Sequence, residues 1–237
     1  MVLATDPRSS LVNFRDVGGL PTDDGRLVPH GVLYRSEAPQ EGDAAPEGIA
    51  PWPVSTVIDL RSEAELFQPH PFRTAGSRVH HMPLDPALAP DAVARIEAAD
   101  DGLVPLYRHL LKVTAEQIAE IATIVANCDG PVLIHCAAGK DRTGMVVGIL
   151  LRAVDVSRAA ILTDYLRTND RLPDLLVRLR RAGLTLPPES ALLGVSADAI
   201  TAVLDEVDSE RGGAAAWLRS AGTDAQTIDR LRARLVA

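Results

Sequence analysis

The feature that most constrains this chain is a short apolar strand joined by a charged loop to an apolar helix. Residues 131–136, PVLIHC, have the length and branched apolar content of a buried strand, and residues 144–154 are apolar around most of a helical circumference. A strand that turns directly into a helix points the N–H groups of the loop, and the positive end of the helix dipole, at one spot. The segment therefore predicts an anion site at the edge of an α/β fold.

The chemistry of this loop depends on Cys136 and Arg142, which have five residues between them. A Walker nucleotide loop does not fit, because Ile134 and Asp141 stand where it needs Gly and then Ser or Thr. A thiol this close to cations and to loop N–H groups is expected to be a thiolate at neutral pH. We therefore predict that Cys136 attacks phosphorus, while the planar fork of Arg142 holds two nonbridging oxygens into the transition state.

The remaining loop residues have supporting roles in this prediction. Gly139 lets the backbone turn closely around the anion, His135 fixes the start of the loop through a hydrogen bond, and the Thr143 hydroxyl donates to the departing sulfur. The predicted substrate-binding residues are His135, Ala137, Ala138, Gly139 and Lys140.

The loop resembles a known signature. His135, Cys136, Gly139, Arg142 and Thr143 reproduce the HCxxGxRT/S pattern of cysteine-dependent protein tyrosine phosphatases. The longer form HCAAGKDRTG resembles the bacterial tyrosine/phosphoinositide phosphatases, whose loop reads HCxAGKDRTG. Further similar segments are NFRDVGG at 13–19, YRSEAP at 34–39, VIDLRSEAE at 57–65 and DYLRTND at 164–170.

This resemblance implies an enzyme that hydrolyses phosphate monoesters through a cysteinyl-phosphate intermediate. Phosphotyrosine proteins, phosphoinositides and small metabolites such as nucleotide or sugar phosphates all stay open as substrates. Lys140 either contacts a second phosphate or a carboxylate on the substrate, or is solvated. Relatives imply that Asp141 is the general acid, although Lys140 and Arg142 favour its ionised form. Asp85, between Pro83 and Pro86 at the end of a predicted strand, is the alternative acid.

Other classes of protein remain as alternatives. Cys136 could be a buried structural cysteine, the loop could belong to a rhodanese-like sulfurtransferase, or the chain could be a phosphate-binding scaffold without turnover. The spacing of Cys136, Arg142 and Thr143 fits phosphate better than a persulfide.

For several charged residues outside the loop, a structural role is one of the predictions. The pairs Arg15–Asp16 and Arg35–Ser36 predict an ion-pair framework beneath the site, and Asp59 with Arg61 is either a site element or a loop hydrogen bond. A basic cluster is interpreted first as a solvated face and second as a lid that guides substrate; it comprises Arg171, Arg178, Arg180 and Arg181.

The fold class expected is α/β, with a central mostly parallel sheet flanked by helices, in a single phosphatase domain over 1–237. Residues 1–155 form the core with the phosphate loop at 135–143, and residues 156–237 form a helical part, a candidate lid. Strands are expected at 32–35, 54–60, 79–84 and 131–136, after a hairpin turn near 23–25. Helices are expected at 114–127, 144–154, 157–168, 173–182, 196–208, 212–221 and 223–236, with capping boxes opening at Thr114 and Thr223.

Composition excludes some partners. The formal charge of −8 argues against a general nucleic-acid or anionic-membrane binder. The start, MVLATDPRSS, lacks a signal-peptide pattern, and no apolar run reaches the ~20 residues of a transmembrane helix. We expect a cytoplasmic protein without cofactor or metal, although secretion without a signal peptide and the oligomeric state stay open. Cys128 is interpreted as a small buried hydrophobe.

Overall fold

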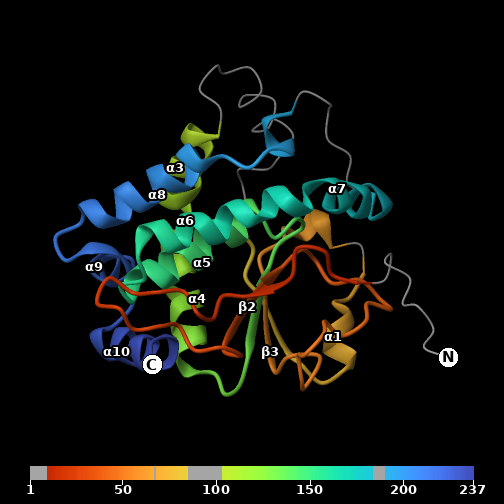
Figure 1. Cartoon of the computed structure of the whole chain (residues 1–237), viewed down its shortest axis with the longest axis horizontal. Coiled ribbons are helices and arrows are strands. Elements are labelled where there is room, and N and C mark those ends of the chain that lie inside the picture. The colour runs from red at the N-terminus through yellow and green to blue at the C-terminus, as the bar shows by residue number, and fades with distance from the viewer. Residues whose placement is uncertain (1–9, 67, 85–102, 184–189) are drawn as a thin grey trace.

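A five-stranded sheet forms the centre of the protein, in the strand order β1-β2-β5-β3-β4 (Figure 1). The computed structural model describes residues 10–66, 68–84, 103–183 and 190–237. Strand β1 pairs with β2 in the antiparallel sense, and every other pair is parallel. The expected mostly parallel sheet is therefore confirmed, with bounds β1 Arg15–Asp16, β2 Leu33–Ser36, β3 Thr56–Asp59, β4 Arg78–His81 and β5 Val132–His135.

Alternating side chains of the central strands serve two different cores. Leu33, Ile58 and Ile134 point into the larger hydrophobic cluster, whereas Val57 and Leu133 point into a smaller one on the other face. This period of two is what a pleated strand imposes when both of its faces are covered. The smaller cluster also holds Phe72 of α1 and is lined by Phe14 and Trp52.

Helices surround the sheet unequally. The short α1 packs against β4 on the side of the smaller cluster, whereas α4, α5 and their neighbours cover the other face (Figure 1). The helices are α1 Pro71–Thr74, α3 Val104–Val113, α4 Ala115–Asn127, α5 Asp141–Ala153, α6 Arg158–Leu166, α7 Leu172–Arg181, α8 Ala197–Ser209, α9 Gly213–Ser220 and α10 Ala225–Leu235. Short 3-10 turns are η2 Glu63–Glu65, η3 Arg167–Arg171 and η4 Ala191–Leu193. Within the described ranges, no helix combines the length and apolar content needed to cross a bilayer.

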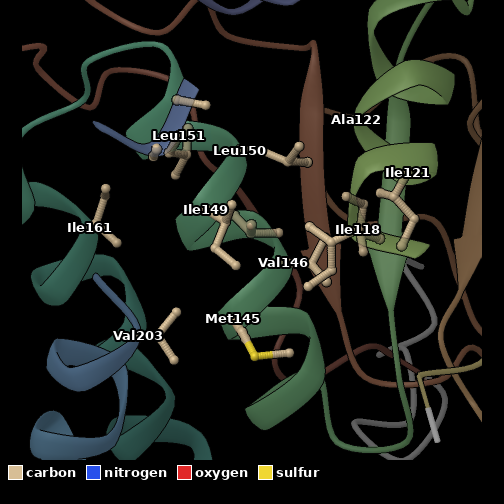
Figure 2. Packing of buried hydrophobic residues seen from close by; sticks show 14 of the residues in the cluster. Ile118, Ile121, Ala122, Met145, Val146, Ile149, Leu150, Leu151, Ile161 and Val203 are labelled. Atoms are coloured by element: carbon tan, nitrogen blue, oxygen red, sulfur yellow. The ribbon is translucent and has the colours of Figure 1, made fainter. Parts of the chain in front are cut away.

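Helix α5 is the centre of the larger core. Figure 2 shows Val146 and Leu150 on the side of α5 toward Ile118 of α4, with Ile161 and Val203 on the opposite side. All but one of its residues are buried, which confirms the expectation drawn from its apolar circumference. The strand and the helix that bracket the phosphate loop are therefore held on all sides, so the loop is anchored at both ends.

The helices after Ser157 do not form one unit. Helices α8, α9 and α10 contribute Val203, Leu218 and Leu231 to the larger core. They belong to the body of the fold, and a lid function within residues 156–237 stays a prediction.

Some elements were not predicted, and both predicted capping boxes are wrong. Strand β1 and helix α3 were not expected, because two residues are too few to show a period and α3 follows a segment without a capping signal. The Thr114 capping box is wrong: α3 runs almost directly into α4, and the Thr114 hydroxyl donates to the carbonyl of Leu110 instead. At α10 the cap is Asp224, whose carboxylate accepts from the Thr227 N–H, while Thr223 donates to Ala119.

Candidate active site

The predicted phosphate loop lies where three parallel strands end. Ser36 of β2 and Asp59 of β3 are both in register with His135, the last residue of β5. Open α/β sheets place their sites at this carboxyl edge. Residues 136–140 then bridge β5 and α5, and Cys136 is only 2% exposed.

Gly139 is required by a close approach of two backbones. Its φ is +66°, and a Cβ placed there would lie 2.2 Å from the carbonyl oxygen of Ser36. The predicted reason was a tight turn around the anion; the structure adds that the loop packs directly on β2. Only glycine satisfies both conditions.

The carbonyl groups of the loop are held from outside. The Ala38 N–H donates to Ala137, the Asn13 side chain to Ala138, and the Arg35 guanidinium to Gly139, at 3.0, 2.9 and 3.0 Å. In a trans peptide the N–H points opposite to the carbonyl. The N–H groups of residues 138–140 are therefore turned toward the interior of the loop, which is the arrangement an anion requires.

The two expected arginines form an ion-pair framework beneath the loop, but their partner is Asp164, whereas Asp16 accepts from the Gly31 N–H and Ser36 donates to a neighbouring carbonyl. Asp164 of α6 accepts from Arg15 and from Arg35, each at 2.8 Å, and all three side chains are buried. Burial opposes ionisation of Asp164, but the two arginines outweigh it and the pKa of Asp164 is lowered. The framework carries the loop because Arg35 also holds the Gly139 carbonyl.

Arg142 is oriented by a residue that the sequence patterns did not single out. Glu65 of η2 accepts two hydrogen bonds from the Arg142 guanidinium, both at 2.6 Å, and Arg142 also donates to Leu60. Burial alone would lower the pKa of Arg142; the hydrogen bonds to Glu65, and then the nearby Cys136, raise it above its usual value. Glu65 lies in VIDLRSEAE, but its role depends on a contact 77 residues away in the chain.

Asp141 lies in a buried polar cluster at the first turn of α5. Its Oδ1 accepts from the Tyr107 hydroxyl at 2.7 Å and from the Lys140 ammonium at 2.6 Å. The Tyr107 hydroxyl also lies 2.7 Å from that of Tyr165. Burial, and then the charge of Asp141, raises the pKa of Tyr107 well above its usual value, so Tyr107 stays a phenol. The solvated alternative for Lys140 is wrong, because that side chain is buried in this ion pair.

Two other predicted site residues have a different outcome. Asp85, the alternative acid, lies outside the described residues. Thr143 is fully buried, and its hydroxyl has no hydrogen-bond partner among the described residues. Its predicted donation to sulfur is therefore not among the contacts of this state.

A group of three residues behind the loop could in principle hold a metal. Ligand atoms of Asp59, His70 and His135 lie within 4.8 Å of one another, a proximity that no sequence spacing indicated. The Asp59 carboxylate, however, already accepts from the Arg61 guanidinium and from the Arg61 N–H. Asp59 and Arg61 are thus a structural pair, one of the two readings left open.

The basic cluster on α7 divides into two kinds of residue. Arg171, Arg180 and Arg181 are exposed, as expected, but Arg178 is buried and pairs with Asp43 and Glu37. This pairing fastens α7 to the segment after β2. Residues 10–15, 40 and 44–47, with one face of η3 and α7, enclose a groove of about 1210 Å³ beside it.

Comparison with known proteins gives one consistent result. The model of a family described as "Tyrosine phosphatase family" matches residues 7–237. The chain is 32% identical to the triple specificity protein phosphatase PtpB of Mycobacterium tuberculosis, over 94% of this chain and 96% of that protein. It is 30% identical to a tyrosine-protein phosphatase of Nostoc commune, over 81% of this chain and 70% of that protein.

Proposed function

We infer the reaction of this chain from the fact that it belongs to the tyrosine phosphatase family and is a phosphatase. Cys136 is the nucleophile for a phosphate monoester, and the single observation that carries this assignment is the geometry around its thiol. The loop N–H groups face inward, and the buried Arg142 lies in the first turn of α5, held by two hydrogen bonds to Glu65. Fixed donors of this kind favour the charge of a transferring phosphoryl group.

The proposed reaction has two steps. The Cys136 sulfur forms a bond to phosphorus as the bond to the ester oxygen breaks, and the leaving oxygen takes a proton. A water molecule then attacks the cysteinyl phosphate and the sulfur leaves as thiolate. The proton of this water goes to the carboxylate that protonated the leaving oxygen in the first step. Arg142 and the N–H groups of residues 138–140 hold the nonbridging oxygens in both steps, and the Thr143 hydroxyl turns to the departing sulfur.

Asp141 is the proposed general acid. Its Oδ1 already accepts from Tyr107 and Lys140, so the transferable proton must sit on Oδ2. A bound phosphate dianion favours that protonated form, because it adds negative charge beside the carboxyl group. Lys140 and Tyr107 then position the group by holding one oxygen in place.

The leaving-group dependence of the rate tests this acid. Wild type, Asp141→Asn and Asp85→Asn would be compared on aryl phosphates whose phenols span a range of acidity. We expect the dependence of kcat/KM on leaving-group pKa to steepen only in Asp141→Asn. If it steepens only in Asp85→Asn, then Asp85 is the acid.

For the substrate we propose more than one class of phosphate ester, since a relative covering most of this chain is named a triple specificity protein phosphatase. Phosphotyrosine proteins come first and phosphoinositides second, with a small metabolite phosphate as the alternative. One catalytic domain over the whole chain is proposed too, and the larger hydrophobic cluster supports it by extending from Val17 to Val236.

The direct experiment compares hydrolysis of p-nitrophenyl phosphate, a phosphotyrosine peptide, a phosphoserine peptide and phosphoinositide vesicles by one preparation. Cys136→Ser is expected to abolish turnover of each substrate while still binding vanadate, and Arg142→Ala is expected to weaken both turnover and vanadate binding. Full activity of Cys136→Ser would overturn the mechanism. Binding of phosphorylated ligands without turnover by the wild type would instead support the scaffold alternative.

A further inference from the structure

Behind the nucleophile, two buried histidines from distant segments contact one another. The Nε2 atoms of His70 and His135 lie 2.9 Å apart, and the ring centroids lie 5.0 Å apart. His70 precedes α1 and caps it, 65 residues before His135, which ends β5 next to Cys136. His70 lies outside the loop signature, yet its ring contacts a residue of that signature.

The outer nitrogens of the two rings assign one proton position to each. The Phe72 N–H donates to Nδ1 of His70 at 3.2 Å, so a neutral His70 carries its proton on Nε2. Nδ1 of His135 faces two acceptors, the Cys136 carbonyl at 3.1 Å and Asp59 Oδ1 at 3.8 Å, so His135 carries its proton on Nδ1. Nε2 of His135 is then the acceptor for the hydrogen bond from His70.

Both rings are neutral in this arrangement. A proton on each Nε2 would place two N–H groups against each other at 2.9 Å, so the contact permits only one. Burial, and then the neighbouring His135, lowers the pKa of His70 to about 3. Burial also lowers the pKa of His135, against the attraction of Asp59.

The same reasoning argues against a metal at this cluster. A metal ion bound to Nε2 of His70 would need a lone pair on that atom. Nδ1 already uses its lone pair to accept from Phe72, so the proton of the neutral ring occupies Nε2. Hydrogen bonds therefore account for the three groups that lie within 4.8 Å of one another.

We propose that His70 is a positioning residue of the phosphatase reaction. Its Nε2–H holds His135 in the form protonated on Nδ1, and His135 in turn holds the Cys136 carbonyl and so the first peptide of the phosphate loop. Without His70, the other neutral form of His135 would turn a lone pair toward the Cys136 carbonyl and Asp59, and the ring would be driven from its place. The inference rests on the proposed function, because the positioned group is the proposed nucleophile.

Two substitutions separate this role from the cap of α1. In His70→Asn the amide oxygen takes the place of Nδ1 and can still accept from Phe72, but no donor reaches His135. In His70→Gln the amide nitrogen takes the place of Nε2 and can still donate to His135, while the cap is lost. His109→Asn, at an exposed position of α3, is the matched control.

The expected result is a reversed order in two assays. On p-nitrophenyl phosphate, kcat falls by about 10- to 100-fold in His70→Asn with KM changed little, and stays within about threefold of wild type in His70→Gln. In thermal unfolding His70→Gln is the less stable of the two. A purely structural role of His70 predicts the same order in both assays, and that outcome would overturn the proposal.

Nitrogen-15 spectra of the imidazole rings provide a readout that does not depend on activity. Wild type is expected to show His135 protonated on Nδ1 and His70 on Nε2, with the His135 signature kept in His70→Gln and lost in His70→Asn. A wild-type His135 protonated on Nε2 would refute the inference. Absence of turnover by the wild type on every phosphate ester would contradict the proposed function instead, and leave these spectra to decide the tautomers.

Discussion

The contact between Glu65 and Arg142 makes a quantitative prediction for Glu65→Gln. Two charge-assisted hydrogen bonds of 2.6 Å join these side chains, and Arg142 has one further bond, to the Leu60 carbonyl. Each such bond contributes about 1.5–3 kcal/mol, and breaking a buried ion pair costs about 3–5 kcal/mol. The amide of glutamine keeps one acceptor, and the Glu65 side chain is itself 17% exposed. We therefore expect Glu65→Gln to lower the free energy of unfolding by about 2–3 kcal/mol.

This loss has two measurable consequences. For a chain of this size it lowers the Tm by about 4–12 °C. Because Arg142 is no longer held toward the loop, kcat/KM for p-nitrophenyl phosphate is expected to fall by about 10- to 100-fold. Burial raises the pKa of Glu65, but its bonds with Arg142 outweigh this, so the pKa is lowered overall. The stabilisation is therefore present above the unfolded pKa of about 4.3 and is lost as the pH falls through the lower folded value.

Glu63→Gln is the control, because it makes the same change in the same turn at a side chain that is 83% exposed. It should leave both quantities near wild type. If Glu65→Gln unfolds within about 0.5 kcal/mol of Glu63→Gln and turns over at the same rate, the ion pair has no part in holding Arg142.

Three further predictions concern other contacts of the site. Gly139→Ala should abolish activity and lower the free energy of unfolding in urea by about 3 kcal/mol or more. Gly25 also has a positive φ, but an added Cβ would meet open space, so Gly25→Ala should lower it by only about 1–3 kcal/mol. Tyr107→Phe should lower the free energy of unfolding by about 1.5–3 kcal/mol, because it removes a hydrogen bond to the Asp141 carboxylate. The control is Tyr34→Phe, because the Tyr34 hydroxyl makes no hydrogen bond to the described residues. Equal losses in the two variants would contradict this account. His70 has a folded pKa of about 3, below the unfolded value of about 6.5, so its contribution is complete above pH 6.5 and is lost on acidification toward pH 3. Urea unfolding at pH 7.5 and pH 5 should therefore show about 2 kcal/mol less acid destabilisation in His70→Gln than in wild type, and identical pH dependence would refute the assigned shift.

The nucleophile, the arginine and the sheet class could all be predicted from the sequence, because each depends on residues close together in the chain. A strand, a loop and a helix in succession place Cys136 and Arg142 at one helix N-terminus whatever surrounds them. Long apolar periods likewise predicted α4 and α5, since burial dictates their pattern. Capping at Thr114 was predicted wrongly because a local motif cannot reveal that the preceding residues are themselves helical.

Tertiary structure alone decided which side chains hold the loop residues. Glu65 meets Arg142 across 77 positions, His70 meets His135 across 65, and Tyr107 meets Asp141 across 34. No spacing or period links such pairs, because they become neighbours only when the folded chain packs η2, the start of α1 and α3 beside the phosphate loop. The sequence by itself identified the groups that we propose react. The packing of distant segments determined the orientation of these groups, because buried polar groups need hydrogen-bond partners and here those partners come from distant parts of the chain.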